Sequence, residues 1–431
     1  MFCNQCEQTA GGTACIEQGV CGKDPDVQSL QETLLYGVKG MAAYAHHARR
    51  LGSTDEQVSA FIEEALFATM TNVNFDKDVL LEMVLQCGRM NLRTMEMLDA
   101  AHCQRFGTPE PTTVFEGTRE GPGILVTGHD LLDLSDLLEQ STGSGVNVYT
   151  HGEMLPAHSY PKLRAHKHLA GHFGTAWQNQ RSEFTRFTGP AVATTNCVLI
   201  PFDTYKDRLF TTRATAVPGA QRIVENDFAA VIEQAKQCKP LAEFESGAST
   251  IGYHHSTLLG MIDQVIDAVK AGQINQVLLI GGCDGAEVGR NYFSEFARNA
   301  PQEAIILTLG CGKYRVRGHD YGTVAGLPRL LDMGQCNDAY GAIQLAAGLA
   351  KALDCGVNDL PLTIVLSWFE QKAVAVLLSL LALGVQGIRL GPAAPGFLTP
   401  NVLNLLQERF DLQLITPPSP PPPSELHEVS L

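Results

Sequence analysis

The hydrophobic positions of the chain follow two periodicities, one helical and one extended. Between residues 26 and 104, apolar side chains recur every three or four residues in VQSLQETLLYGVKGMAAYAHHARRL, EQVSAFIEEALFATM and DVLLEMVLQCGRMNLRTMEMLDAA. This spacing is typical of amphipathic helices. Short links such as TNVNFD separate the segments, so we expect a three-helix bundle. Met90, Met95 and Met97 are interpreted as core residues of that bundle.

From residue 123 onward, short apolar runs alternate with segments of helical pattern. The runs have the length and composition of buried strands: GILVTG (123–128), VNVYTHG (146–152), PAVATTNCVLI (190–200), QVLLIGG (276–282), AIILTLG (304–310), LPLTIVLSWF (360–369) and GIRLG (387–391). Strands that alternate with crossover helices predict parallel sheets. A further apolar run, residues 373–385, is too short to span a bilayer and is expected to be a buried helix.

Changes in composition divide the chain. The segment 105–122 is rich in Gly, Pro and Thr and marks a boundary. We expect an α/β multidomain protein with an N-terminal cysteine loop and helical bundle (1–110). Two Rossmann-like α/β domains with parallel sheets are expected to follow, at 120–240 and 245–416. The proline-rich tail, 417–431, is expected to be extended or disordered.

Charge and missing motifs exclude several classes of function. The chain has 46 acidic and 31 basic side chains, a net charge of −15 with His neutral. Such a charge repels nucleic acids and anionic membranes, so neither is expected as a partner. The opening MFCNQCEQTA has no signal-peptide pattern, and we expect a soluble cytoplasmic protein. No phosphate-binding P-loop, dinucleotide fingerprint or hydrolase nucleophile elbow is present.

Four of the twelve cysteines lie close together at the start of the chain. Their spacing is C-x2-C-x8-C-x5-C, formed by Cys3, Cys6, Cys15 and Cys21. In a long cytosolic chain, clustered cysteines indicate metal ligands or catalytic groups. Four thiolates suit either tetrahedral zinc or an iron–sulfur cluster. Zinc sites usually contain two CxxC pairs and this segment has one, so an iron–sulfur cluster is favoured and zinc is the alternative.

Four further cysteines lie at the ends of predicted elements. Cys197, Cys283 and Cys311 each follow an apolar run, which places them at the strand ends where α/β sheets bind ligands. Cys336 precedes a predicted helix, whose N-terminus stabilises a thiolate. The remaining cysteines are interpreted as small buried hydrophobic residues: Cys87, Cys103, Cys238 and Cys355.

Several charged residues occupy the same kind of position. His129 follows GILVTG, Glu153 follows VNVYTHG, and Glu370 follows LTIVLSWF, with Lys372 two residues on. A lone residue of this type in a loop is usually solvated, but shared placement with Cys197 raises the expectation of a common site. Thiolates combined with imidazole and carboxylate suit iron that is bonded to sulfide on one side and to oxygen or nitrogen on the other.

The sequence resembles the hybrid cluster protein family, also called prismane proteins or hydroxylamine reductases. The resemblance extends from residue 1 to about residue 400. It is carried by MFCNQCEQT, GVCGK, TNVNFD, GHDLLDL, GVNVYTHGEMLPAH, TNC, LIGGCDGA, LGCGKYR, GQCNDAY, LSWFEQKA and GPAAPGFLTP. Longer members have two helical bundles before the first α/β domain, whereas this chain has room for one and resembles the shorter class.

The resemblance implies two clusters. Cys3, Cys6, Cys15 and Cys21 match the ligands of a [4Fe–4S] cubane. A hybrid [4Fe–2O–2S]-type cluster is implied on seven ligands: His129, Glu153, Cys197, Cys283, Cys311, Cys336 and Glu370. Cys283 matches a cysteine that members can carry as a persulfide, and Lys372 matches a lysine near the open side of the cluster. The catalytic residues are then expected to be Glu153, His129, Lys372 and Cys283.

The implied reaction is the reduction of hydroxylamine to ammonia and water with two electrons and two protons. We expect an external redox protein to supply the electrons, and the chain to be a monomer or homodimer. Three alternatives stay open: reduction of nitric oxide in nitrosative-stress defence, a non-catalytic redox or nitric oxide sensor, and a zinc-stabilised binding module. The related carbon monoxide dehydrogenases share the fold, but a ligand set with two glutamates resembles the hybrid cluster rather than a nickel site.

Overall fold

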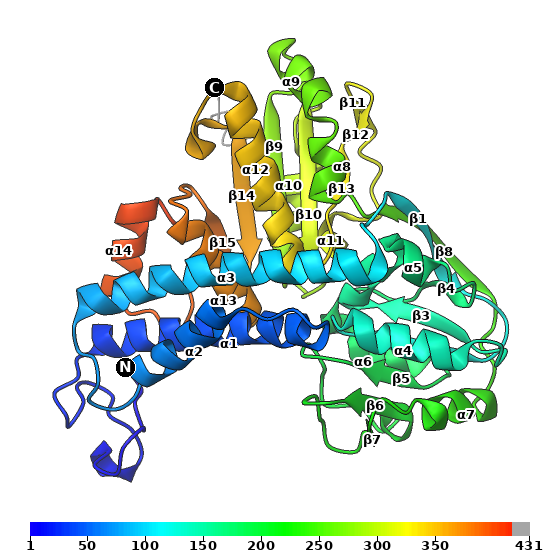
Figure 1. Cartoon of the computed structure of the whole chain (residues 1–431), viewed down its shortest axis with the longest axis horizontal. Coiled ribbons are helices and arrows are strands. Elements are labelled where there is room, and N and C mark those ends of the chain that lie inside the picture. Colours follow the sequence, from blue (N-terminus) through cyan, green and yellow to red (C-terminus); the bar gives the residue numbers. More distant parts are fainter. Residues whose placement is uncertain (416–431) are drawn as a thin grey trace.

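A computed structural model of the chain describes residues 1–415. Three helices follow the cysteine loop: α1 (Pro25–Arg50), α2 (Glu56–Ala68) and α3 (Lys77–Phe106). Each begins after an aspartate whose side chain accepts backbone N–H bonds of the first turn: Asp24, Asp55 and Asp76. The long helices α1 and α3 lie side by side and run beneath the second sheet towards the first (Figure 1). The predicted three helices are therefore present.

The first sheet has eight strands in the order β7-β6-β5-β2-β3-β4-β1-β8. They are β1 (Thr112–Thr118), β2 (Gly123–Thr127), β3 (Asn147–His151), β4 (Leu169–His172), β5 (Ala191–Ala193), β6 (Leu209–Thr212), β7 (Gln221–Ile223) and β8 (Phe244–Ile251). All neighbours are parallel except β8, which pairs antiparallel with β1. Helices α4 (Leu131–Ser141) and α7 (Ala229–Gln237) share a core with one face of this sheet.

The second sheet has six parallel strands in the order β13-β10-β9-β14-β15-β16. They are β9 (Gln276–Gly282), β10 (Ala304–Gly310), β13 (Leu330–Asp332), β14 (Leu362–Ser367), β15 (Arg389–Gly391) and β16 (Gln413–Leu414). On one face the core includes residues of α8 (His255–Leu259), α9 (Ile262–Lys270) and α12 (Ala339–Leu353). On the other face, α10 (Tyr292–Arg298) packs against β9 and β10. Helices on both faces satisfy the burial that parallel sheets require.

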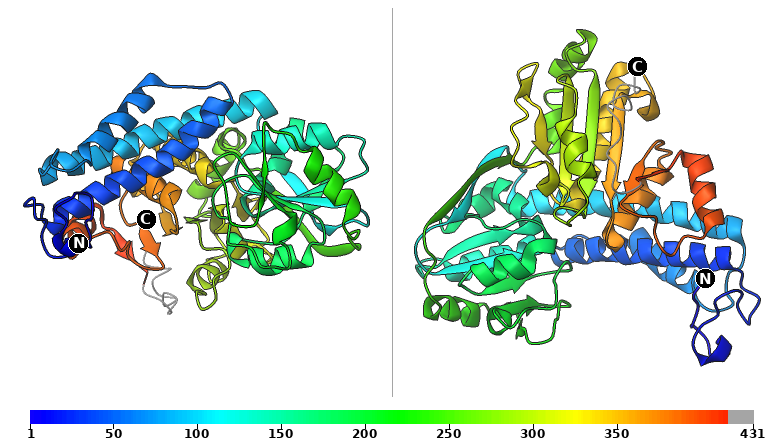
Figure 2. Two further views of the ribbon diagram at one scale, coloured as in Figure 1. Left: turned by 90° about the horizontal axis from the view of Figure 1, so that it is seen from below. Right: turned by 180° about the vertical axis from the view of Figure 1, so that it is seen from behind.

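The remaining elements are short or peripheral. They are α5 (Pro161–Arg164), α6 (Gln180–Arg186), α11 (Lys313–Val316), α14 (Pro400–Phe410), the two-stranded ribbon β11 (Thr323–Val324) and β12 (Leu327–Pro328), and the 3-10 helices η1 (Ala10–Gly12), η2 (Gly152–Ser159), η3 (Trp177–Asn179), η4 (Lys206–Arg208), η5 (Cys336–Asp338) and η6 (Val357–Asp359). Seen from below and from behind, the cysteine loop lies at the end of the α1–α3 layer that is far from the first sheet (Figure 2). No helix of residues 1–415 is both long and apolar enough to cross a bilayer.

Helix α13 (Gln371–Ala382) connects the helical layer to the second sheet. It approaches α1 and α3 closely because glycines face it: a Cβ on Gly40 would overlap the carbonyl of Gln371, and one on Gly88 would overlap that of Leu378. The hydroxyl of Ser379 donates to the carbonyl of Gly88 at 2.9 Å. The predicted buried helix is therefore present over residues 373–382 as part of α13, and the run 383–385 lies beyond its end, where Leu383 is exposed.

The strand and boundary predictions need corrections. In the run 190–200 only Ala191–Ala193 form a strand. An irregular segment follows and leads to Cys197. The expected boundary segment 105–122 contains β1, and β8 joins that strand in the first sheet although the second domain was expected to begin at residue 245. The pairing of β1 with β8 accounts for both differences. The tail prediction, 417–431, lies outside the described residues.

Candidate metal centre

Two buried thiols lie at the carboxyl edge of the second sheet. Cys283 and Cys311 directly follow the neighbouring parallel strands β9 and β10, whose last residues, Gly282 and Gly310, are in register. Both glycines have positive φ, 108° and 66°. A Cβ on Gly282 would also overlap the carbonyl oxygen of Ser367. Because only glycine fits there, the chain can turn at once and present the two thiols together.

The first sheet presents its predicted ligands in a similar manner. His129 and Glu153 each lie two residues beyond the neighbouring strands β2 and β3. Nε2 of His129 is 3.2 Å from Oε2 of Glu153. Cys197 lies four residues beyond β5 with a φ of 68°, a left-handed conformation that is uncommon outside glycine. Its thiol interacts electrostatically with Cys283 and Glu153, so the two sheet edges face a common space.

The remaining two predicted ligands lie at the starts of helices. Cys336 begins η5, and its backbone N–H donates to Oε2 of Glu153 at 2.8 Å. Glu370 immediately precedes α13, and its carboxylate accepts the backbone N–H of Lys372 at 3.0 Å. The charge of Glu370 acts on the thiols of Cys197, Cys283 and Cys336. The structure therefore brings all seven predicted ligand residues and Lys372 to one place.

Neighbouring side chains orient the histidine and the glutamate. Gln335 donates from Nε2 to the backbone carbonyls of His129, at 3.2 Å, and Glu153, at 2.8 Å. Nδ1 of His129 lies 2.7 Å from the hydroxyl of Thr195. If Nδ1 donates its proton to that hydroxyl, Nε2 carries a lone pair. That Nε2 is buried and makes no hydrogen bond, which is the arrangement of a metal-ligating histidine with its other nitrogen fixed by a partner.

The raised pKa values of the four thiols mean that they ionise only when a cation binds. Burial raises the pKa of all four thiols above the usual range, and the carboxylates raise it further: Cys197, Cys283, Cys311 and Cys336. Burial would also raise the pKa of Glu153, but His129 and Lys372 lower it below the usual value. Burial and Lys372 lower the pKa of His129 and keep its imidazole neutral.

Lys372 is the buried cation of this group. Burial would lower its pKa, but Cys336, Glu370 and Cys197 raise it above the ordinary value. Its Nζ lies over the ring of Tyr44, 5.9 Å from the centroid. Four thiolates beside two carboxylates would exceed the negative charge that one lysine can offset, so the thiols ionise only together with a bound cation. Bound metal ions would supply the missing positive charge, so the donor set fits a metal cluster.

The N-terminal cysteines lie in a separate loop at the surface. Cys3 and Cys15 form a short antiparallel bridge, with backbone N···O distances of 3.1 and 2.8 Å. The backbone N–H of Ala10 donates to Sγ of Cys15 at 3.5 Å and lowers the pKa of that thiol. Lys23 is buried with Nζ 3.9 Å from Sγ of Cys3. N–H groups and a cation around thiols are what a cluster of net negative charge requires.

The spacing of the four loop thiols indicates which metal they could bind. In the described part of the chain, three ligand atoms of His, Cys, Asp or Glu come within 4.8 Å of one another at two places. These are the group His129, Glu153 and Cys336 and the group Asp99, His254 and His255. The loop thiols belong to neither group. In a zinc site with four cysteine ligands, a Zn–S distance of about 2.3 Å places the sulfur atoms about 3.8 Å apart.

The sequence did not indicate several residues that support the thiols. Trp177 and Gln178 donate side-chain N–H groups to the backbone carbonyl of Cys283 at 3.0 and 3.2 Å. Trp177 also stacks on Phe369, with ring centroids 4.0 Å apart. Trp177 and Gln178 follow no apolar run. The search for ligands at the ends of predicted strands therefore could not indicate them. Tyr44 lies on the apolar face of a predicted helix, so the sequence did not distinguish it from a core residue.

Comparisons with known proteins identify one family and its relatives. The model of the Prismane/CO dehydrogenase family matches residues 1–84 and 76–420. A protein of Moorella thermoacetica named hydroxylamine reductase is 58% identical over 418 residues, which are 97% of this chain and 98% of that protein. A Rhodospirillum rubrum protein of the same name is 55% identical over 93% of this chain but only 73% of its own length. The chain is thus similar both to relatives of its own length and to longer ones.

Solved structures show the same fold at low identity. Carbon Monoxide Dehydrogenase IV from Carboxydothermus hydrogenoformans superposes with a TM-score of 0.76 over 99% of this chain and 91% of that chain, with 16% identical residues. A carbon monoxide dehydrogenase from Thermococcus sp. AM4 gives a TM-score of 0.78 over 99% of this chain and 89% of that chain, also at 16% identity. At this identity the likeness concerns the fold alone.

Proposed function

The chain belongs to the Prismane/CO dehydrogenase family, and from that premise we propose that it is an iron–sulfur oxidoreductase that reduces hydroxylamine. The reaction is NH2OH + 2 e⁻ + 2 H⁺ → NH3 + H2O. The name and the high identity of the relatives support this activity. The observation that carries it is the convergence of four thiols, an imidazole and two carboxylates at the facing edges of the two sheets.

We propose that these seven residues hold the hybrid iron–sulfur–oxygen cluster. The thiolates would be the soft ligands for iron bonded to sulfide, and the imidazole and carboxylates would suit iron bonded to oxygen. Nε2 of His129, which makes no hydrogen bond, lies 3.2 Å from Oε2 of Glu153, so these two groups lie together. The chemistry that such a cluster supplies when bound is the two-electron cleavage of an N–O bond. Whether Cys283 carries a persulfide stays a prediction.

The residues of the chain supply position and protons. Lys372 keeps its ammonium group in the buried site because the surrounding anions raise its pKa, and we propose that Nζ holds the substrate oxygen and passes it a proton. His129 stays neutral and is fixed at Nδ1 by Thr195. Gln335 holds the backbone carbonyl of Glu153, and the backbone N–H of Cys336 holds its carboxylate.

We propose that a [4Fe–4S] cubane on Cys3, Cys6, Cys15 and Cys21 receives the electrons. Its loop is largely exposed, so an external redox protein can reach it, whereas the thiols of the other centre are buried. Two observations support a multi-iron cluster over zinc. The thiols are more widely spread than ligands of one zinc ion, and backbone N–H and Lys23 Nζ groups point at sulfur.

The test is anaerobic turnover with a chemical electron donor and quantification of ammonia. We expect one ammonia for each hydroxylamine consumed and many turnovers per chain. Cys355→Ala, which removes a partly buried thiol outside both groups, is the matched control and should behave as the unmodified protein. Ammonia formation limited to one equivalent per chain would overturn the enzymatic proposal and favour a sensor.

A further inference from the structure

Helix α1 places one large polar side chain beside the predicted cluster ligands. Tyr44 is 2% exposed and belongs to the apolar core that the helical layer shares with the second sheet. It lies four residues after Gly40, so both lie on the same face of α1. Gly40 lets the start of α13 approach, because a Cβ there would overlap the backbone carbonyl of Gln371. The aromatic ring of Tyr44 is thereby brought close to Lys372, whose Nζ lies 5.9 Å from the ring centroid.

The hydroxyl of Tyr44 faces the predicted ligands. Within residues 1–415 it is a buried oxygen that makes no hydrogen bond of standard geometry. Burial, reinforced by the charges of Cys336, Glu370 and Glu153, raises the pKa of the phenol far above its usual value, so the hydroxyl keeps a proton to donate. Burial also raises the pKa of the Cys336 thiol, whereas the Tyr44 hydroxyl acts on it in the opposite direction. That is the effect of a hydrogen-bond donor directed at sulfur.

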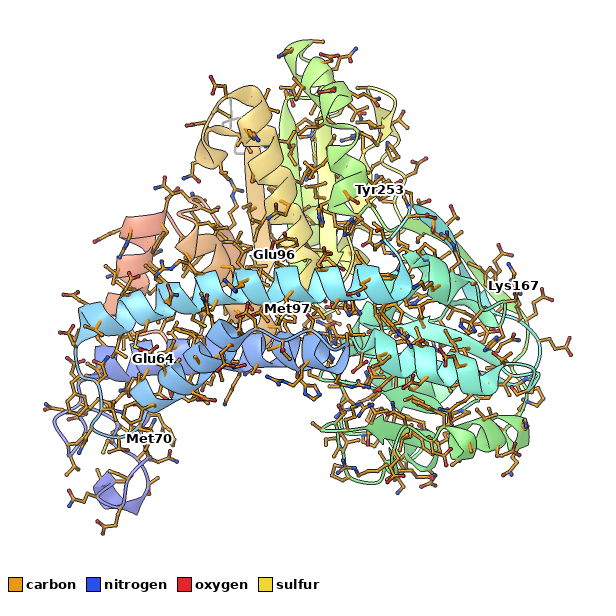
Figure 3. All side chains as sticks on the ribbon, in the orientation of Figure 1. Glu64, Met70, Glu96, Met97, Lys167 and Tyr253 are labelled. Atoms are coloured by element: carbon orange, nitrogen blue, oxygen red, sulfur yellow. The ribbon has the colours of Figure 1, made fainter. Side chains whose placement is uncertain are left out.

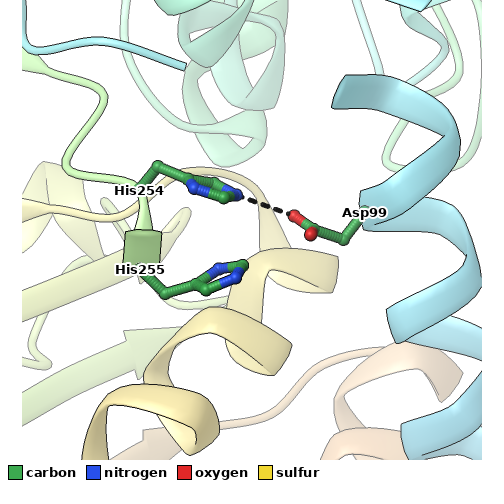
Figure 4. A group of neighbouring side chains, drawn as sticks. All are labelled: Asp99, His254 and His255. Atoms are coloured by element: carbon green, nitrogen blue, oxygen red, sulfur yellow. Dashed lines mark hydrogen bonds and ion pairs between the residues drawn. The ribbon is translucent and has the colours of Figure 1, made fainter. Parts of the chain in front are cut away.

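A buried histidine at the junction of the helical layer with the second sheet shows the contrasting case, because both of its ring nitrogens have partners. Nε2 of His254 lies 3.0 Å from Oδ1 of Asp99, where α8 meets α3 (Figure 4). Nδ1 of His254 accepts the backbone N–H of Ser256 at 3.2 Å. Buried polar groups are normally paired in this way, since an unpaired one costs free energy. The unpaired hydroxyl of Tyr44 is accounted for if its acceptor is a ligand that becomes anionic when metal binds.

We propose that Tyr44 is a positioning residue of the buried centre, with its hydroxyl donating to the thiolate of Cys336 and its ring holding the ammonium of Lys372. This role rests on the proposed cluster, because Cys336 becomes a thiolate acceptor only as a metal ligand. Hydrogen bonds to ligand sulfur help to set the reduction potential of an iron–sulfur centre, since a donor stabilises the more negative, reduced state. The face of the aromatic ring attracts a desolvated ammonium group and so keeps Nζ of Lys372 in place.

The test separates the hydroxyl from the ring by means of two substitutions. Tyr44→Phe keeps the ring and removes the hydroxyl, whereas Tyr44→Leu removes both. Potentiometric EPR titration of the anaerobically purified, iron-loaded protein measures the reduction potentials of the two clusters separately. We expect the potential of the buried cluster to fall in Tyr44→Phe, because its reduced state loses a hydrogen-bond donor. The potential of the loop cluster should stay unchanged.

The matched control is Tyr253→Phe, which removes the hydroxyl of another buried tyrosine. Tyr253 is 9% exposed and belongs to the same apolar core as Tyr44. Figure 3 shows it above α3, near the α3 end that adjoins the first sheet. Burial alone raises the pKa of its phenol, so no charged group of the centre acts on it. We expect both potentials and hydroxylamine turnover to match those of the unmodified chain.

Hydroxylamine turnover then tests the role of the ring. Tyr44→Leu should lower turnover by at least about 10-fold, whereas Tyr44→Phe should retain most of it, since Lys372 keeps the aromatic face. An unchanged or higher potential in Tyr44→Phe, or equal turnover in the two variants, would overturn the proposal. A chain that shows no turnover but a lowered potential in Tyr44→Phe would contradict the reductase activity and support the hydrogen bond to Cys336. Absence of a second cluster signal in the unmodified chain would overturn the cluster assignment and the role of Tyr44 together.

Discussion

The two groups of cysteines that carry the proposed chemistry are built in opposite ways. The N-terminal group lies within residues 3–21, on one largely exposed loop stabilised by a short backbone bridge. The other group gathers side chains from His129 to Glu370, taken from both sheets and from the starts of η5 and α13. In the loop, thiol spacing is fixed by local sequence; in the buried centre it is fixed by strand register and helix packing.

This difference has a chemical consequence. N–H groups of Ala10 and Val20 lower the pKa of Cys15 in the loop, whereas burial raises the pKa of Cys283 and its partners. The loop suits a cluster that exchanges electrons with an external partner. The buried centre is shielded from solvent and combines thiols, an imidazole and carboxylates, which suits the transformation of a small molecule.

The largest effect is expected from removing a thiol of the buried centre. Cys283→Ala should lower hydroxylamine turnover by more than about 100-fold, because even loss of a partner that only orients a metal ligand costs about 10–100-fold. Iron bound by the loop should stay, since the two groups share no residue. Steady-state ammonia formation and iron counts measure both effects. Full activity in this variant would contradict the assignment of Cys283.

The next effect concerns two glycines with positive φ, one in each region. Gly282→Ala should destabilise the protein by about 3 kcal/mol or more, because the added Cβ overlaps the Ser367 carbonyl as well as straining the backbone. Gly12→Ala meets nothing within 4 Å and should cost about 1 kcal/mol from backbone strain alone. Anaerobic urea unfolding compares them. Equal costs would show that close packing at the sheet edge is unimportant.

A residue that orients the buried ligands without binding metal should have a smaller effect. Gln335→Leu removes the hydrogen bonds to the backbone carbonyls of His129 and Glu153. We expect turnover to fall by about 10-fold with unchanged iron content. The matched substitution Gln386→Leu, at an exposed position beyond α13, should leave turnover unchanged. If Gln335→Leu also behaves as the unmodified chain, the centre does not depend on this support.

The smallest effect is expected in the loop. Lys23→Met removes the buried ammonium group near Cys3, which also donates to the side-chain oxygens of Gln28 and Gln31. Loss of a positive charge favours the oxidised, less negative cluster, so its reduction potential should fall by roughly tens of millivolts. Turnover with a strong chemical donor should change less than about threefold. Potentiometric EPR titration measures the shift, and an increase in potential would contradict the account.

Much of the fold could be predicted because the spacing of hydrophobic residues along the chain indicates which side of each helix or strand is buried. The strands β9 and β10 coincide with the predicted runs 276–282 and 304–310, and the strand-end rule located residues that the structure brings together. The pairing of β8 with β1 could not be predicted, since FESGASTI is polar, contains glycine and lies at an exposed edge.

The central claim is that one chain carries two separate iron centres of different construction. The most direct measurement is the iron and acid-labile sulfide content of anaerobically purified protein, compared between the unmodified chain and Cys283→Ala, with EPR of the reduced and oxidised states. The account predicts about eight irons per chain, one signal typical of a cubane, and a second signal that is lost in the variant. About four irons in the unmodified chain, with a spectrum that Cys283→Ala leaves unchanged, would contradict it.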